Sequence, residues 1–226
     1  MSIADNIETV RSKIESACWS SQRDPANVRL LAVSKTRTAD EVDVAIQAGL
    51  CHFGENYLQD ALDKVERVAT QVSWHFIGAI QSNKTRLIAE HFSWVHTLSS
   101  QKAARRLNEQ RPKHLPALKT LIQINIDNDP DKAGLGIDEV GEFLHETRDF
   151  KRLNICGLMT IPGKPGKGAN STSKPFAQLR GLRDDLRLEY PELTELSMGM
   201  SGDLEAAISE GATWVRIGTA IFGPRN

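Results

Sequence analysis

The stretch Leu30-Leu31-Ala32-Val33-Ser34-Lys35 decides how this chain is interpreted, because it is a short apolar run that ends in a lysine. Its leucine and valine content is typical of a strand that is covered on both faces, as in parallel sheets. Lysine is rarely buried without a partner, and burial lowers its pKa, which leaves more of it as the amine that attacks carbonyl carbons. Lys35 is therefore either a nucleophilic amine or a lysine that reaches solvent where the strand frays.

Seven further apolar runs follow, and segments with helical periodicity separate them. The predicted strands lie at residues 28–35, 51–54, 74–78, 94–98, 117–126, 155–161, 195–199 and 214–218. The predicted helices lie at residues 2–20, 39–48, 56–69, 81–91, 101–110, 137–148, 175–190 and 204–210. This alternation predicts an α/β fold with a parallel sheet. Eight units in about 200 residues favour a single closed (β/α)8 TIM barrel with an extra N-terminal helix over an open doubly wound sheet.

Composition limits the class of protein. The 226 residues, 40% of them hydrophobic, are enough for one core, so we expect one domain over residues 1–226 and a monomer. The net charge is −1 with both signs interspersed, which gives no electrostatic footprint for nucleic acid or a membrane. Three cysteines without a C-x-x-C pair, no leader-like N-terminus and no apolar run of about 18 residues lead us to expect a cytoplasmic protein.

One glycine-rich segment interrupts the alternation at residues 163–175. It superficially resembles a phosphate-binding loop, but Ala169 follows Gly168 where the Walker pattern needs lysine. We therefore expect a mobile loop at the rim of the barrel rather than a nucleotide site.

The loops after the seventh and eighth predicted strands are suited to phosphate, which barrels of this kind often hold there. Ser201 and Gly202 precede a predicted helix, whose first backbone N–H groups are unpaired and can face an anion. The alternative is an ordinary helix cap made by Ser201 or Asp203. In the eighth strand, Arg216 and Gly218 lie on the face opposite Val215.

Arg216 needs a partner inside the barrel, because it lies within a strand. In a closed barrel the eighth strand neighbours the first, so Arg216 and Lys35 are expected side by side at the same end. The alternative for Arg216 is an ion pair with a buried carboxylate. An imine-forming lysine, two phosphate loops and an arginine together specify a phosphorylated aldehyde, and pyridoxal 5′-phosphate (PLP) fits all three.

Seven motifs in register carry a family resemblance. They are Ala32-Val33-Ser34-Lys35-Thr36, Phe53-Gly54-Glu55-Asn56-Tyr57, His75-Phe76-Ile77-Gly78, Gln81-Ser82-Asn83-Lys84, Gly157-Leu158-Met159, Ser197-Met198-Gly199-Met200-Ser201 and Arg216-Ile217-Gly218-Thr219-Ala220-Ile221-Phe222-Gly223. From about residue 3 to residue 225 the chain closely resembles the YggS/PROSC family of pyridoxal-phosphate homeostasis proteins.

The resemblance implies a barrel similar to the N-terminal domain of alanine racemase (PLP fold type III), in which Lys35 holds PLP as an internal aldimine. It further implies that the phosphate is held by Ser201, Gly202, Gly218 and Thr219. Arg216 would face the pyridine nitrogen, and the ring would be lined by Asn56, Met159 and Ser197. No residue is assigned a catalytic role.

The function that the resemblance implies is buffering or delivery of PLP, the active form of vitamin B6, with PLP-dependent apo-enzymes as possible recipients. We expect little turnover, because arginine donates a hydrogen bond but no proton to the ring nitrogen, and because the chain ends at Asn226 without the racemase's second domain. The alternatives are a PLP-dependent racemase or lyase, and a Schiff-base aldolase that uses Lys35 without a cofactor.

Three further residues are singled out. Lys132 lies in Asp131-Lys132-Ala133-Gly134, which resembles a loop of the racemase family, and is either a second aldehyde-reactive amine or a solvated lysine. His75 is expected to be a core or rim histidine. His91 and His96 lack the H-E-x-x-H spacing, so no metal site is expected.

Overall fold

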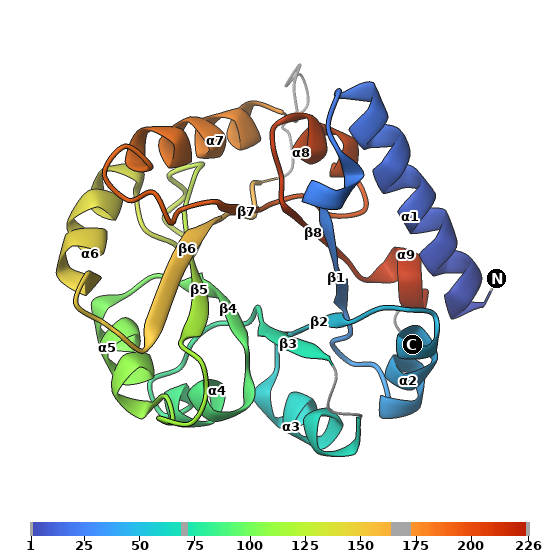
Figure 1. The fold of residues 1–226 in the computed structure, drawn as a ribbon, viewed down its shortest axis with the longest axis horizontal. Helices are drawn as coiled ribbons and strands as arrows, with labels where there is room; N and C mark the ends of the chain where they lie inside the picture. The colour runs from blue at the N-terminus through green and yellow to red at the C-terminus, as the bar shows by residue number, and fades with distance from the viewer. Residues whose placement is uncertain (1, 69–71, 164–172, 225–226) are drawn as a thin grey trace.

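Eight parallel strands close into one barrel, as the alternation of apolar runs predicts. The computed structural model describes residues 2–68, 72–163 and 173–224. The strands follow one another around the barrel in chain order, and β8 pairs with β1 (Figure 1). They are β1 Arg29–Val33, β2 His52–Glu55, β3 Ser73–Phe76, β4 Trp94–Leu98, β5 Leu118–Gln123, β6 Leu153–Met159, β7 Glu195–Ser197 and β8 Trp214–Ile217.

Helices surround the strands (Figure 1). They are α1 Ile3–Ser20, α2 Ala39–Gln47, α3 Leu58–Arg67, α4 Thr85–His91, α5 Gln101–Gln110, α6 Val140–Thr147, α7 Lys174–Leu186, α8 Leu204–Ser209 and α9 Thr219–Phe222, with short 3₁₀ turns at Pro25–Asn27 and Ile137–Glu139. The extra helix α1 begins with a reciprocal cap between Ser2 and Asp5. It packs beside α8 and α9, and the amide of Asn6 donates to the carbonyl of Ile221 at 2.9 Å.

Several predicted strands extend beyond the observed ones at the end that carries the site, and two differences matter there. The first strand ends at Val33, so Lys35 lies in the turn after it, where Thr36 has a φ of 64°. The chain turns because the N–H of Arg37 donates to the carbonyl of Ser34 at 3.0 Å. The four-residue helix α9 was not anticipated, because its sequence continues the apolar run of the eighth strand. Most of the predicted rim loop, residues 164–172, lies outside the described residues.

The barrel has two apolar layers. The larger one lies between the strands and the helices. The smaller one fills the barrel itself and consists of Leu31, Trp94, Leu121, Cys156, Met159 and Trp214. Met159, the last residue of β6, belongs to this inner layer, so the layer reaches the C-terminal ends of the strands, where barrels of this kind carry their sites.

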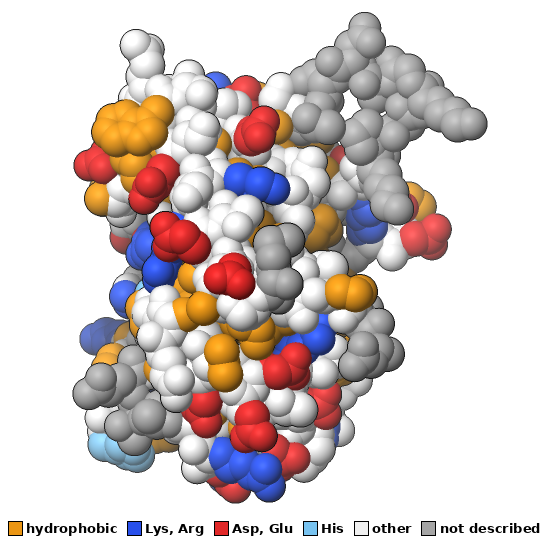
Figure 2. All heavy atoms as spheres, turned by 90° about the vertical axis from the view of Figure 1, so that its right-hand side faces the viewer, with side chains coloured by type: hydrophobic (Ala, Val, Ile, Leu, Met, Phe, Trp, Pro, Cys, Tyr) orange, Lys and Arg blue, Asp and Glu red, His pale blue; other side chains and the backbone are white. Residues whose placement is uncertain are grey.

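The outer surface shows no concentration of one charge on the face that Figure 2 presents. Basic and acidic side chains are interspersed there over α1, α2 and α9 (Figure 2). Among the helices of the described residues, none is long and apolar enough to cross a membrane.

Candidate functional site

A cavity of about 320 Å³ opens at the C-terminal ends of the strands. Its walls come from the ends of β1, β2, β3, β6 and β8 and from the turn before α8. The lining residues are Val33, Lys35, Asn56, Ile77, Met159, Ile161, Met200, Ser201, Gly202, Arg216, Gly218 and Thr219. The cavity therefore brings together eight of the nine residues that the sequence analysis assigned to a cofactor site.

Lys35 reaches this cavity from a turn whose backbone is fixed on both sides. The N–H of Ser34 still donates to the carbonyl of Gly54 in β2 at 3.0 Å, which continues the ladder one residue beyond β1. The tight turn at Thr36 then directs the chain into α2. Lys35 itself is half-buried and lines the cavity.

A buried ion pair supports the Lys35 turn from below, and the sequence analysis did not find it. The ammonium of Lys64, on α3, donates to Glu55 Oε1 at 2.7 Å and to the carbonyl of Ser34 at 2.8 Å. The Ser34 hydroxyl donates to the same carboxylate oxygen at 2.6 Å. Burial raises the pKa of Glu55, and Lys64 and Ser34 oppose this. The missed signal was the position of Lys64, three residues after Ala61 on the apolar face of its helix.

Arg216 is buried at the base of the cavity, and its hydrogen-bond partners in the described part of the chain are neutral. Its Nη1 donates to the Ser197 hydroxyl at 2.8 Å, and its Nη2 donates to the carbonyl of Thr160 at 2.9 Å. Within residues 2–68, 72–163 and 173–224, Arg216 forms no ion pair with a carboxylate. Burial lowers its pKa to about 10, with distant Asp203 opposing, so the guanidinium remains charged at neutral pH.

The two loops that the sequence analysis singled out for phosphate, at Ser201–Gly202 and Gly218–Thr219, line the same cavity. Ser201 and Gly202 lie in the turn before α8, and an added Cβ at Gly202 would meet nothing within 4 Å, so the backbone there is open. Gly218 precedes α9, and a Cβ there would lie 3.3 Å from the carbonyl of Val33. Glycine at 218 thus lets β8 pass close to β1, and residues of both turns line the cavity.

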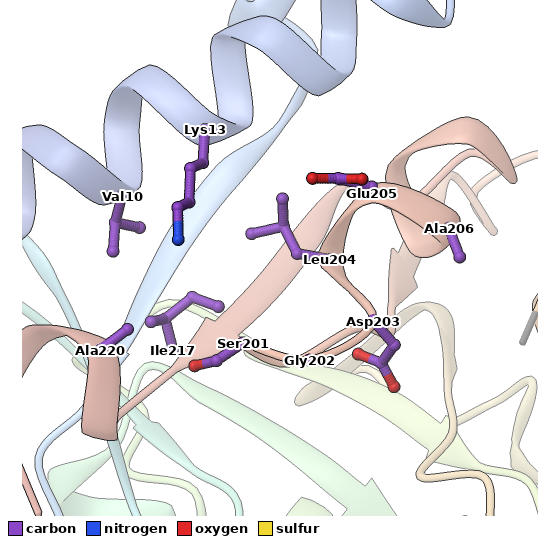
Figure 3. Close-up of a pocket in the computed structure, with 10 residues that line it drawn as sticks. All are labelled: Val10, Lys13, Ser201, Gly202, Asp203, Leu204, Glu205, Ala206, Ile217 and Ala220. Atoms are coloured by element: carbon purple, nitrogen blue, oxygen red, sulfur yellow. The ribbon is translucent and has the colours of Figure 1, made fainter. Parts of the chain in front are cut away.

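The turn at Ser201 and Gly202 also forms the wall of a second cavity of about 310 Å³, which lies between α1, α8 and α9. Figure 3 shows the amine of Lys13 pointing from α1 towards this turn. Asp203 and Glu205 line the same cavity, so its charge is mixed. We take the cavity of Lys35 as the site, because it combines an amine and a guanidinium with no lining carboxylate among the described residues.

Of the three residues predicted to line the ring, two lie in the wall of the cavity and one lies behind it. Asn56 and Met159 line the cavity, and the buried Oδ1 of Asn56 has no hydrogen-bond partner among the described residues. Ser197 is fully buried behind Arg216, where its hydroxyl also contacts His96 Nδ1 at 2.9 Å. Ser197 therefore acts on the cavity through Arg216 rather than as part of its wall.

The remaining predicted residues lie away from the cavity lining. Lys132 is ion-paired with Asp127 and lies 3.9 Å from Asp129 Oδ2. His75 is fully buried inside the barrel, where it contacts two other histidines. No group of three or more side chains that could hold a metal ion occurs in the described part of the chain.

Comparison with known proteins identifies the family of the chain. Residues 2–226 match the family described as "Alanine racemase, N-terminal domain". The chain is 50% identical over 225 residues to the pyridoxal phosphate homeostasis protein of Pseudomonas aeruginosa, covering 99% of this chain and 96% of that one. It is 45% identical to the protein of the same name from Escherichia coli K12, covering 99% and 97%.

Two solved structures place the fold. PipY of Synechococcus elongatus PCC7942, solved with PLP bound, superposes with a TM-score of 0.84 at 37% identity and covers 98% of this chain and 100% of that one. Alanine racemase of Corynebacterium glutamicum has a TM-score of 0.72 at 16% identity and covers 99% of this chain and 60% of that one, a likeness of fold alone. The fold and the lysine-bearing cavity thus define an alanine racemase N-terminal-type barrel.

The chain belongs to this family and, within it, to the pyridoxal phosphate homeostasis proteins. The family resemblance and the TIM-barrel fold that the sequence predicted are both confirmed.

Proposed function

We propose that this chain binds PLP in the cavity of Lys35 and serves to buffer or deliver the cofactor without significant turnover. The observation that carries the proposal is the make-up of the cavity, which offers one amine, one guanidinium and two glycine-containing turns but no carboxylate among its described lining. The names of the relatives and the PLP found in PipY support it.

The residues present fit PLP group by group. The hydroxyls of Ser201 and Thr219 and the N–H groups of the two turns suit a phosphate dianion. Arg216 is a donor for a ring nitrogen, and the unpartnered Asn56 Oδ1 accepts from a polar group of the ligand. When bound, PLP supplies an amine-reactive aldehyde and an electron-withdrawing pyridine ring.

Lys35 is the residue placed to bind the aldehyde carbon. It shares the cavity with Arg216. The buried pair of Glu55 and Lys64 fixes the backbone carbonyl of Ser34, one residue before Lys35. The amine is thereby presented from a rigid turn rather than from a mobile loop.

The same residues argue against efficient catalysis. Arg216 donates a hydrogen bond but keeps its proton, so a ring nitrogen facing it stays neutral and stabilises a carbanion poorly. A racemase needs an acid on the side opposite its lysine, and apart from Lys35 and Arg216 the described lining contains no titratable side chain. This composition disfavours the racemase or lyase alternative.

The proposal includes a monomeric cytoplasmic protein that passes PLP to PLP-dependent apo-enzymes. Light scattering of the purified protein tests the first point. Transfer to an apo-enzyme, measured with and without a competing PLP trap, separates direct handover from release into solution.

The test of the binding site is the visible absorption spectrum of the purified protein beside Lys35→Ala. Borohydride reduction and peptide mapping then locate the label, with Lys132→Ala as the matched control. We expect a yellow wild type labelled at Lys35, a colourless Lys35→Ala and an unchanged Lys132→Ala. A wild type that stays colourless with added PLP would overturn the proposal and favour the cofactor-free aldolase.

The test of the non-catalytic role is a search for racemisation and decarboxylation of amino acids by the loaded protein. We expect rates far below about 1 per second, the low end of ordinary enzymes. Turnover at or above that rate would place the protein among the enzymes instead.

A further inference from the structure

Three histidines form a continuous hydrogen-bonded chain through the interior of the barrel. His52 begins β2, His75 lies in β3 and His96 lies in β4. His52 Nδ1 is 3.1 Å from His75 Nε2, and His75 Nδ1 is 2.9 Å from His96 Nε2. The chain continues from His96 Nδ1 to the Ser197 hydroxyl at 2.9 Å and ends at Arg216. It therefore runs from a half-exposed residue to the base of the cavity.

The middle of this chain is shielded from water. His75 and His96 are fully buried, and the ring of His75 stacks on Trp94 with centroids 5.3 Å apart. Trp214 contacts His52 and His75 edge to face at 4.8 and 4.9 Å. Burial, followed by the charges of neighbouring groups, holds the pKa of His75 and of His96 well below the usual value. Both imidazoles are therefore neutral near neutral pH.

Neutral imidazoles in such a chain are locked together. Each has one N–H and one bare nitrogen, and each nitrogen-to-nitrogen contact needs one of each. The three rings must therefore all carry the proton on Nε2 or all carry it on Nδ1. Arg216 can only donate to Ser197 Oγ, and among the described residues the acceptor in contact with the Ser197 hydroxyl is His96 Nδ1, so the hydroxyl proton is hydrogen-bonded only when it donates to His96. This selects the Nε2–H form for all three rings in the neutral state.

We propose that His52, His75 and His96 are positioning residues that set the direction of the Ser197 hydroxyl beside Arg216, and that protonation of His52 reverses this direction. The doubly protonated His52 must donate from Nδ1, which His75 Nε2 can accept only as a bare nitrogen. His75 and His96 then each lose the proton on Nε2 and carry one on Nδ1. The Nε2 proton of His75 passes to His52 Nδ1, that of His96 passes to His75 Nδ1, and the Ser197 hydroxyl gives its proton to His96 Nδ1. Ser197 regains a proton from water that enters through the cavity, so the chain gains one proton in all, and the hydroxyl proton then points away from His96.

The consequence for the cavity lies in the partner of Arg216. In the reversed state Ser197 Oγ accepts from His96 and from Arg216 together, so the hydroxyl oxygen is shared and holds the guanidinium less firmly. A change of charge at the far end of the barrel is in this way transmitted to the group that faces the ligand. The effect on PLP rests on the proposed function. The coupling of the three tautomers follows from the hydrogen bonds alone and does not depend on that function.

Charged groups from several elements surround His52 and set the pH at which it titrates. Burial comes first and lowers the pKa of His52, and Arg29 and Lys119 lower it further. Arg29 is itself paired with Glu195 and lies over the Trp214 ring. His52 also lines a cavity of about 360 Å³, whose other titratable groups are Arg11, Glu15, Arg29 and Cys51. The transition is therefore expected on the acid side of the usual histidine range.

The experiment is a pH titration of the ligand-free, ¹⁵N-histidine-labelled protein followed by NMR of the ring nitrogens. We expect Nε2–H in all three rings at neutral pH. On acidification His96 should switch to Nδ1–H with the same midpoint as His52, while remaining neutral. A neutral state with Nδ1–H, or a His96 that titrates with a midpoint of its own, would overturn the proposal.

Two variants separate transmission from structure. His75→Gln keeps a hydrogen-bonding side chain that cannot exchange tautomers, so His52 should still titrate while His96 no longer follows. If this variant does not fold, His52→Gln at the half-exposed end removes the titration, and His96 should keep one tautomer throughout. His114→Gln, at an exposed position, is the control and should behave as wild type. A His96 that still switches in a folded His75→Gln or His52→Gln contradicts the proposal.

A second readout uses the loaded protein. The visible absorption of bound PLP should change with pH at the His52 midpoint, and this inflection should disappear in His52→Gln. If the protein binds no PLP, the proposed function is wrong, but the NMR titration of the ligand-free protein still tests the coupling of the histidines. A protein that binds PLP and shows locked tautomers, yet has identical absorption profiles with and without His52, would overturn the link to the cavity.

Discussion

Lys64 and Arg216 are both buried cations close to the same cavity, but they are neutralised in different ways. Lys64 contacts the buried carboxylate of Glu55 at 2.7 Å and a backbone carbonyl. Arg216 contacts a hydroxyl and a carbonyl, neither of which carries charge. Burying a charge is unfavourable unless it is paired, so among the described residues the charge of Lys64 is compensated and that of Arg216 is not.

The difference agrees with the proposed roles, in which Lys64 is structural and Arg216 contacts the ligand. The pair of Lys64 and Glu55 fixes the turn that carries Lys35 without lining the cavity. Arg216 does line the cavity and retains a charge that the described part of the protein leaves without a carboxylate. A bound ligand with an acceptor atom would provide a further partner for this guanidinium. The following predictions test this contrast.

The largest effect is expected for Lys64→Met. It leaves the Glu55 carboxylate buried without its cation, which should lower the free energy of unfolding by about 4 kcal/mol. Arg216→Met strands no carboxylate and should change it by only about 1 kcal/mol. Urea unfolding of both variants measures the difference. Equal losses would show that the two cations play the same role, and a double variant of Lys64→Met with Glu55→Gln should recover part of the loss.

The pH dependence of stability should give the next largest effect. The pKa values of His75 and His96 are lowered in the folded state, so the unfolded chain binds more protons below its own histidine pKa of about 6.5. Stability should therefore fall as pH drops below that value, by up to about 1.4 kcal/mol per pH unit for each histidine.

Arg216 sharpens this test, because its charge is the second cause of the lowered His96 pKa, after burial. Arg216→Met should thus make the acid-side loss shallower. Chemical unfolding between pH 7 and pH 5 measures it, with His114→Gln as the control. The pKa of Glu55 is raised in the folded state, so its contribution to stability is lost as pH rises, which is opposite to the effect of the histidines. If the free energy of unfolding increased on acidification, Glu55 would outweigh the histidines.

A smaller effect concerns the affinity for PLP. Arg216→Met removes a charged donor facing the ligand, and hydrogen bonds of charged groups contribute about 2 kcal/mol, which corresponds to roughly 30-fold weaker binding. Absorbance titration with PLP measures this. A fully retained affinity would show that Arg216 does not contact the ligand.

The smallest effect is expected at the phosphate side. Ser201→Ala removes one hydroxyl, and the loss of about 1 kcal/mol corresponds to roughly fivefold weaker PLP binding. Because Ser201 borders two cavities, Lys13→Ala is the matched control and should leave the affinity unchanged. The reverse pattern would place the ligand in the cavity beneath α1.

The sequence predicted the loops that line the cavity but not the ion pair that supports the Lys35 turn. The loops at Ser201 and Gly218 were found from the sequence, because glycine and serine after a strand are local signals. The ion pair of Glu55 and Lys64 was missed, although the lysine interrupts an apolar helix face. The end of the first strand was misplaced by two residues, because the turn at Thr36 depends on contacts with β2 and α2.

The sequence by itself determined the barrel, the lysine and the two turns, because periodicity and turn residues act over a few neighbouring positions. Only the tertiary structure decided that Arg216 has no carboxylate partner among the described residues, that Ser197 lies behind it and that three histidines from separate strands form one chain. Those contacts join residues 19 to 101 positions apart, and closure of the barrel sets which of them meet.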